Sequence, residues 1–157
     1  MGLAQHIHRI VNSVIPVSQR SSGGVYYTFL PTGAGLLGAK PVTLTAHTGT
    51  AYKYGAVATV ISATANTTEC WIEGVVLSAP NAAKLNWMIA VTTATAITAA
   101  SQIAAELPAY LAATAEQLPL ILPAPVYIPA NKAIGLAAGS SSAGKTVNAY
   151  VIISRNR

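Results

Sequence analysis

Ionised side chains are scarce in this 157-residue sequence, in which only 8% of the residues are Asp, Glu, Lys or Arg. A soluble globular domain usually carries about 25%. Aspartate is absent, so four glutamates are the only carboxylates, and nine Lys and Arg residues leave a net charge of +5. Apolar residues make up 52% of the chain, and the mean hydropathy is +0.48. A surface with so few charges favours association with other molecules, either lipid or protein.

The shortage of acids also argues against catalysis and metal binding. Acid–base chemistry needs two carboxylates, or a carboxylate and a His, in one cleft. Glu69 and Glu73 are four residues apart on or beside a predicted strand, where Glu73 is more simply an outward strand position. The histidines and the single thiol do not form a set of well-spaced metal ligands: His6, His8, His47 and Cys70. We therefore expect no enzyme activity, no cofactor, no metal and no internal disulfide.

Neither a membrane nor a nucleic acid is indicated as a dedicated partner. The longest uncharged run, between Lys84 and Glu106, is long enough to span a bilayer. It contains several polar residues, however, and its β-branched residues suit strands better than a helix. The basic residues are spread singly along the chain, whereas nucleic-acid-binding surfaces show clustered basic residues with interleaved aromatics. The uncharged surface is therefore expected to be covered by other protein chains.

The first 22 residues differ in pattern from the rest and are predicted to form an N-terminal arm. Apolar residues recur there at helical spacing with a basic residue between them. Pro16 ends this pattern, and residues 21–24 have the composition of a flexible hinge. The arm is either a short helix packed on its own domain or an extension that reaches a neighbouring subunit. Its candidate assembly-interface residues are Leu3, Ile7, Arg9, Ile10, Val11 and Val14.

Residues 23–157 are predicted to form one β-sandwich domain. Apolar and polar or small residues alternate there with a period of two, which is typical of strands. About eight short strands separated by turn signals are typical of a sandwich or jelly roll. The predicted strands cover residues 25–30, 42–46, 57–61, 71–77, 85–95, 121–127, 133–138 and 146–154. Pro123 and Pro125 make the strand at 121–127 an edge or irregular strand.

The alanine-rich stretch 98–115 is the part of this domain that could be helical. Pro108 interrupts it. We expect a loop there with one short helical turn.

Two glycine-containing stretches match nucleotide-binding motifs in their letters alone. Residues 139–146 fit the phosphate-binding loop, but that loop must open a helix, and residues 147–153 read as a strand. Residues 33–38 spell the dinucleotide fingerprint, but Pro41 blocks the helix that must follow, and the first acid is Glu69. We interpret the first stretch as a hairpin loop and the second as a turn.

Once these strands are assigned, parts of the chain resemble small jelly-roll virion proteins of tailed bacteriophages. Residues 69–77 and 87–91 resemble the middle of such proteins. The ending also resembles theirs, because a Pro, apolar, Ile-Pro-Ala element at residues 125–130 leads into the last hairpin at 133–138 and 147–153. The likeness covers residues 65–154.

The resemblance implies a capsid decoration or cement subunit on the virion surface, made in the host cytoplasm. Its implied partners are the major capsid protein and further copies of itself, often as a trimer. Two other functions stay open. One is a tail, neck or fibre-tip component of the particle. The other is a carbohydrate-binding β-sandwich module, which would need two or three aromatic side chains on one exposed face.

Overall fold

The computed structural model describes residues 26–30, 41–78, 84–112 and 117–155. These residues form nine strands and one 3-10 turn, with no α-helix among them, so the prediction of an all-β fold is confirmed. None of the described residues belongs to a helix that is long and apolar enough to cross a membrane. The predicted arm at 1–22, with all six of its candidate interface residues, and the turn at 33–38 lie outside the described residues.

The first sheet is antiparallel and has β9 and β4 at its centre. Its strands lie in the order β1-β9-β4-β7, and β2 also pairs with β9. β1 pairs with residues 151–155 of β9 and β2 with residues 146–149, so both short strands share one side of β9. The strands of this sheet are β1 (Tyr26–Leu30), β2 (Val42–Thr45), β4 (Cys70–Ser78), β7 (Gln117–Ile128) and β9 (Thr146–Arg155).

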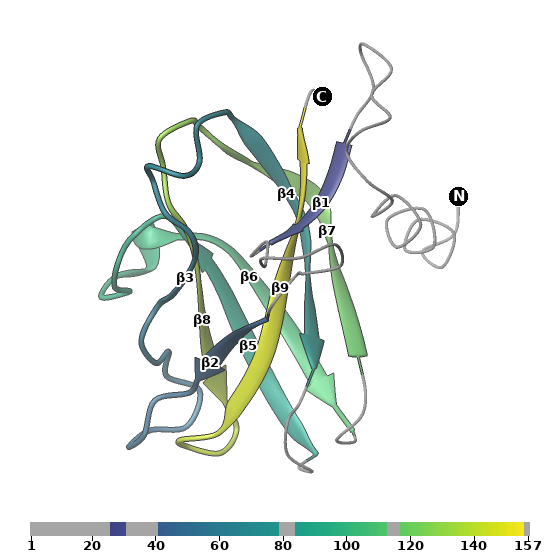
Figure 1. The fold of residues 1–157 in the computed structure, drawn as a ribbon. Helices are drawn as coiled ribbons and strands as arrows, with labels where there is room; N and C mark the ends of the chain where they lie inside the picture. The colour runs from purple at the N-terminus through teal and green to yellow at the C-terminus, as the bar shows by residue number, and fades with distance from the viewer. Residues whose placement is uncertain (1–25, 31–40, 79–83, 113–116, 156–157) are drawn as a thin grey trace.

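The second sheet is also antiparallel and lies beside the first in Figure 1. Its strands lie in the order β3-β8-β5-β6. They are β3 (Ala58–Ile61), β8 (Ile134–Ser140), β5 (Leu85–Thr92) and β6 (Ile103–Leu111). Consecutive strands of the chain therefore often belong to different sheets.

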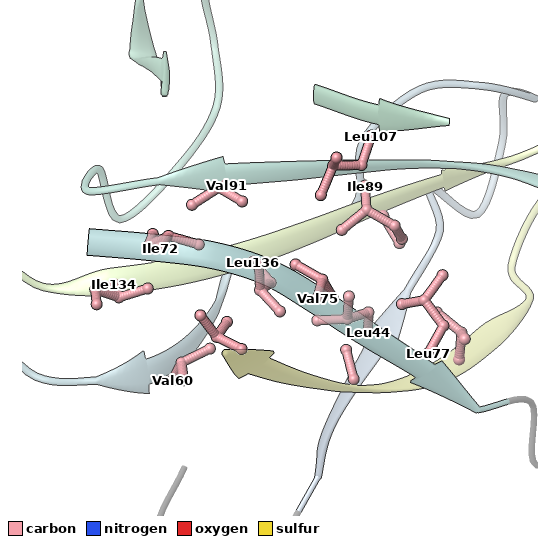
Figure 2. Packing of buried hydrophobic residues seen from close by; sticks show 14 of the residues in the cluster. Leu44, Val60, Ile72, Val75, Leu77, Ile89, Val91, Leu107, Ile134 and Leu136 are labelled. Atoms are coloured by element: carbon pink, nitrogen blue, oxygen red, sulfur yellow. The ribbon is translucent and has the colours of Figure 1, made fainter. Parts of the chain in front are cut away.

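Buried side chains of both sheets belong to one hydrophobic cluster, so the sheets are packed against each other. Figure 2 shows Ile72, Val75 and Leu77 of β4 gathered with Ile89 of β5 and Leu136 of β8. Side chains of a strand point alternately to its two faces, so the period-two pattern of the sequence supplies one apolar face per strand. Each fully buried Leu, Ile or Val contributes about 1.5–3 kcal/mol relative to exposure.

All eight predicted strands are present, with small differences at their ends. The interpretation of β7 as an edge strand is confirmed, because β7 lies at the end of its sheet. An edge strand tolerates proline because the missing N–H can face away from the ladder. The strand predicted to reach residue 95 ends at Thr92, whose hydroxyl donates to the carbonyl oxygen of Gln102 at 2.6 Å and turns the chain.

The interpretation of residues 98–115 as a loop is wrong for the described part of this stretch, which ends at residue 112. A short helical turn is present at Ala100–Gln102, but β6 follows it directly. Four residues of β6 with a spacing of two are buried in the core or packed against it: Ala105, Leu107, Ala109 and Leu111. Pro108 points outward on this edge strand, where it breaks no central ladder. The strand was not predicted because alanine is common in helices. Packing of these residues against the first sheet stabilises the strand.

Candidate functional site

Each of the three described glutamates accepts a hydrogen bond from a hydroxyl group. The partners come from strands or connections far away in the chain, and the fold brings the two groups of each pair together. The pairs are Tyr127 to Glu69 at 2.8 Å, Ser154 to Glu73, and Tyr54 to Glu106. The carboxylates thus serve as fixed acceptors on the sheet surfaces.

Glu69 and Glu73 occupy different environments. Glu69 is exposed just before β4, whereas Glu73 on β4 is only 2% exposed. Ile153 of β9 points into the core, so its neighbour Ser154 points to the outer side of the sheet, together with Glu73. The predicted outward position of Glu73 is thus shielded from solvent. The two carboxylates accept hydrogen bonds from different hydroxyls, those of Tyr127 and Ser154.

Cys70 and His47 have structural contacts. Cys70 is fully buried at the start of β4, and its thiol lies 4.0 Å from the side-chain oxygen of Asn66. Burial raises the pKa of the Cys70 thiol, and the positive charge of Arg155 opposes this effect. His47 accepts a hydrogen bond from the backbone N–H of Gly49 at its Nδ1 atom, at 3.1 Å. Among the described residues, no three His, Cys, Asp or Glu side chains are grouped to hold a metal ion.

The stretch 139–146 is a loop, as predicted, but the prediction of a hairpin is wrong, because β8 belongs to the second sheet and β9 to the first. Its first two residues end β8 and its last residue begins β9. The backbone N–H of Ser142 donates to the hydroxyl of Ser140 at 3.1 Å, and Gly144 has a φ of 67°. Glycine adopts this left-handed conformation without steric cost, which explains its place in the turn.

An aromatic pair lies on the first sheet where β4 and β7 are neighbours. Trp71 and Tyr127 are opposite each other in the strand register, with ring centroids 5.4 Å apart and planes inclined by 54°. Tyr127 is 49% exposed. Its hydrogen bond to Glu69 raises the pKa of the Tyr127 hydroxyl. This aromatic pair offers ring surface and a carboxylate acceptor at one exposed place.

A second tyrosine–carboxylate pair crosses the outer face of the second sheet. Ala90 is the register neighbour of Glu106 on one side and of Ala137 on the other. Tyr54 lies beyond β8, since the next residue, Gly55, donates its N–H to the β8 carbonyl of Ala138 at 3.0 Å. The side chains of Tyr54 and Glu106 therefore meet above the two alanines, which point outward yet are 0% exposed. Burial, and then the hydrogen bond and charge of Glu106, raise the pKa of Tyr54.

Tyrosines are the large apolar side chains most exposed among the described residues. Tyr52, Tyr110 and Tyr127 are 53%, 50% and 49% exposed. Tyrosine has an apolar ring and a polar tip and is enriched in protein interfaces. Trp71 and Tyr127 form the candidate binding surface, whereas Tyr110 lies on β6 of the other sheet and Tyr52 in the β2–β3 connection. This surface was not predicted from the sequence, because Trp71 and Tyr127 meet only through the register of β4 and β7.

Comparison with known proteins found no match of this chain to a family model, to a curated protein or to a solved structure. The fold, the exposed tyrosines and the distribution of charge therefore supply the functional argument.

Proposed function

We propose that this chain is a virion structural protein, a capsid decoration or cement subunit that binds and stabilises a shell of major capsid protein. The order of the strands is the observation that carries this proposal. When β2 to β9 are lettered B to I in chain order, the two sheets read B-I-D-G and C-H-E-F. This order supports a jelly-roll sandwich, an architecture that recurs in viral capsid proteins and in lectins.

The composition supports a role that depends on contact between subunits. Few charges and half-exposed tyrosines suit a protein whose surface is covered by neighbours in an assembly. Burial of apolar area contributes about 25 cal/mol per Å² before the costs of association are subtracted. In this proposal the chain forms a homo-oligomer, and the arm at 1–22 adds a further attachment point, so several weak contacts act together. Neither enzyme activity nor a cofactor is part of this role.

The test is to locate and count the chain in assembled particles. Purified shells mixed with the full-length chain are expected to bind it in a copy number close to that of the major capsid protein. Deletion of residues 1–20 is expected to leave a folded domain with weaker attachment. A few copies at one vertex would instead indicate the tail, neck or fibre-tip role. A chain that stays monomeric and binds no shell would contradict the proposal.

A second candidate function is carbohydrate binding, which the Trp71–Tyr127 pair specifically favours. Aromatic rings contact the apolar faces of sugars, and the Glu69 carboxylate beside them would accept hydrogen bonds from sugar hydroxyls. A glycan array probed with the full-length chain tests this function. The control is Tyr110→Ala, which changes an equally exposed tyrosine of the other sheet. Carbohydrate binding is supported if Tyr127→Ala abolishes glycan binding and Tyr110→Ala does not. An array without any bound glycan would exclude the sugars displayed.

A further inference from the structure

Three lysines that are far apart in the sequence lie at one end of the two packed sheets. β2 and β8 run toward this end, and β5 and β9 start from it, as the pairing of Thr45 with Thr146 and of Trp87 with Ser140 shows. Lys53 lies in the connection from β2 to β3, Lys84 directly precedes β5, and Lys145 lies in the connection from β8 to β9. These segments lie at the lower end of the molecule in Figure 1. We call this surface the lysine end.

Backbone hydrogen bonds hold the segments of the lysine end together. The carbonyl of Lys145 accepts from the N–H of Ala46 at 2.8 Å, and the carbonyl of Lys53 accepts from the N–H of His47 at 3.3 Å. The backbone carbonyl of His47 in turn accepts a hydrogen bond from the N–H of Gly144 at 3.0 Å. Both lysines thus belong to one network of loops around His47.

The start of β5 is bound to the same β8–β9 connection. The N–H of Ser141 donates to the carbonyl of Asn86 at 2.9 Å, and the N–H of Asn86 donates to the Ser141 hydroxyl at 3.3 Å. Lys84 is two residues from this double contact. Hydrogen bonds thus connect the β2–β3 connection, the β8–β9 connection and the start of β5, so the three lysines are attached to one constrained part of the backbone.

The positive charge of this end is not balanced by the described carboxylates. Lys53, Lys84 and Lys145 are exposed, and none forms an ion pair with a described acid. Glu69 lies at the opposite end of the sheets, before the first residue of β4. The other two described glutamates accept hydrogen bonds from hydroxyls within the sheets. Glu116, in the β6–β7 connection, lies outside the described residues.

An exposed tyrosine in a constrained backbone conformation accompanies the lysines. Tyr52 has a φ of 59°, which a bulky residue rarely adopts, and its N–H donates to the carbonyl of Ser140 at 2.7 Å. A Cβ atom at Gly139 would lie 2.8 Å from the carbonyl oxygen of Tyr52, so only glycine permits this close approach. The fold thus holds a half-exposed aromatic ring beside Lys53. Strained residues of this kind cluster at ligand-contact sites.

We infer that the lysine end docks onto an acidic face of a partner protein, which under the proposed function is the major capsid protein. Exposed cations with no acidic neighbour among the described residues fit an anionic partner surface. Tyr52 beside them adds the aromatic contact that is typical of protein interfaces. Duplex nucleic acid fits less well, because affinity for it depends on many phosphate contacts, and the described residues of this end offer three lysines and one histidine.

Charge reversal tests the inference. The triple variant Lys53→Glu, Lys84→Glu, Lys145→Glu is compared with Lys132→Glu, which changes an equally exposed lysine in the β7–β8 connection at the other end. Circular dichroism first establishes that both variants are folded. Purified shells are then sedimented with each full-length chain at 50 and 300 mM NaCl. The triple variant is expected to bind about tenfold or more weakly, and the wild type to lose affinity in high salt.

A second measurement separates this inference from the proposed function. Poly-L-glutamate, duplex DNA and anionic phosphatidylserine vesicles are offered to the wild type and to both variants in the same buffer. Preference for poly-L-glutamate, lost in the triple variant alone, supports an acidic protein partner even if the shells bind nothing. Equal shell binding by the two variants overturns the inference and leaves the cement function standing. Stronger binding to DNA or vesicles than to poly-L-glutamate, or no binding to any probe, also overturns it.

Discussion

The hydroxyl of Ser154 donates a hydrogen bond to the carboxylate of Glu73, 81 positions earlier in the chain, and both side chains are buried. The contact joins the two central strands of the first sheet. A buried acceptor that loses a donor retains the cost of its desolvation.

We therefore expect Ser154→Ala to lower the free energy of unfolding by about 1–3 kcal/mol. Urea denaturation followed by circular dichroism measures this change. Ser101→Ala, at an exposed position of the short helical turn, is the matched control and should change stability by less than about 0.5 kcal/mol. Equal stability of the two variants would show that the buried pair is energetically unimportant.

The hydrogen bond from Tyr54 to Glu106 predicts a loss of stability in alkaline solution. The pKa of Tyr54 is raised above its ordinary value of 10.0, so the folded chain keeps this proton after the unfolded chain has released it. The contribution of the pair is fully present below about pH 10 and decreases as the pH rises above that value. Tyr54→Phe should cost about 1 kcal/mol at pH 8.

The difference in unfolding free energy between the wild type and Tyr54→Phe should shrink from pH 8 to pH 11. Cys70 and Tyr127, whose pKa values are also raised, are present in both proteins, so their contributions cancel in the difference. Urea denaturation at several pH values gives the two curves. A difference that stays constant over this range would argue against a shared proton-dependent contact.

Gly74 lies where the register of β4 shifts against both of its neighbours. A Cβ atom there would be 2.3 Å from the carbonyl oxygen of Leu120, so the backbone of β7 would have to move. We expect Gly74→Ala to destabilise the chain by about 1–3 kcal/mol. In Gly49→Ala the added atom would meet the His47 ring at 3.6 Å, and the change should stay below about 1 kcal/mol. Thermal denaturation of both variants is the measurement, and equal melting temperatures would refute the expected clash.

Asn66 ties two connections together from a fully buried position. Its side-chain amide donates to the carbonyls of Lys132 at 2.9 Å and Pro129 at 3.3 Å. Asn66→Ala removes this donor and leaves the two carbonyls to find other partners, with an expected cost of about 2 kcal/mol. Asn86→Ala, at an exposed position, is the control for loss of an asparagine side chain. Faster hydrogen exchange confined to residues 62–69 and 129–133 would locate the effect of the change.

Local patterns allowed most of the fold to be predicted. Strand periodicity indicated β2, β4 and β9 because alternate side chains of a strand face the core, and the prolines of β7 indicated an edge. β6 was missed because alanine is common in helices, although Ala105, Leu107 and Ala109 already alternate with outward residues. The sequence correctly predicted that Glu73 points to the outer side of its strand. It did not predict that Glu73 is buried, because burial depends on what covers that side.

The candidate surfaces could be predicted far less well. Trp71 and Tyr127 are 56 positions apart and meet only because β4 and β7 pair in one register. The same holds for the lysine end. Lys53, Lys84 and Lys145 are isolated basic residues in the sequence, and only the folded chain brings their segments to one end of the sheets.

The sequence by itself determined an all-β chain with few charges, because strand periodicity and composition are properties of neighbouring residues. Only the tertiary structure decided which distant side chains share a surface, because that depends on the pairing and register of strands. A shift of one residue in a register would turn every side chain of that strand to the opposite face.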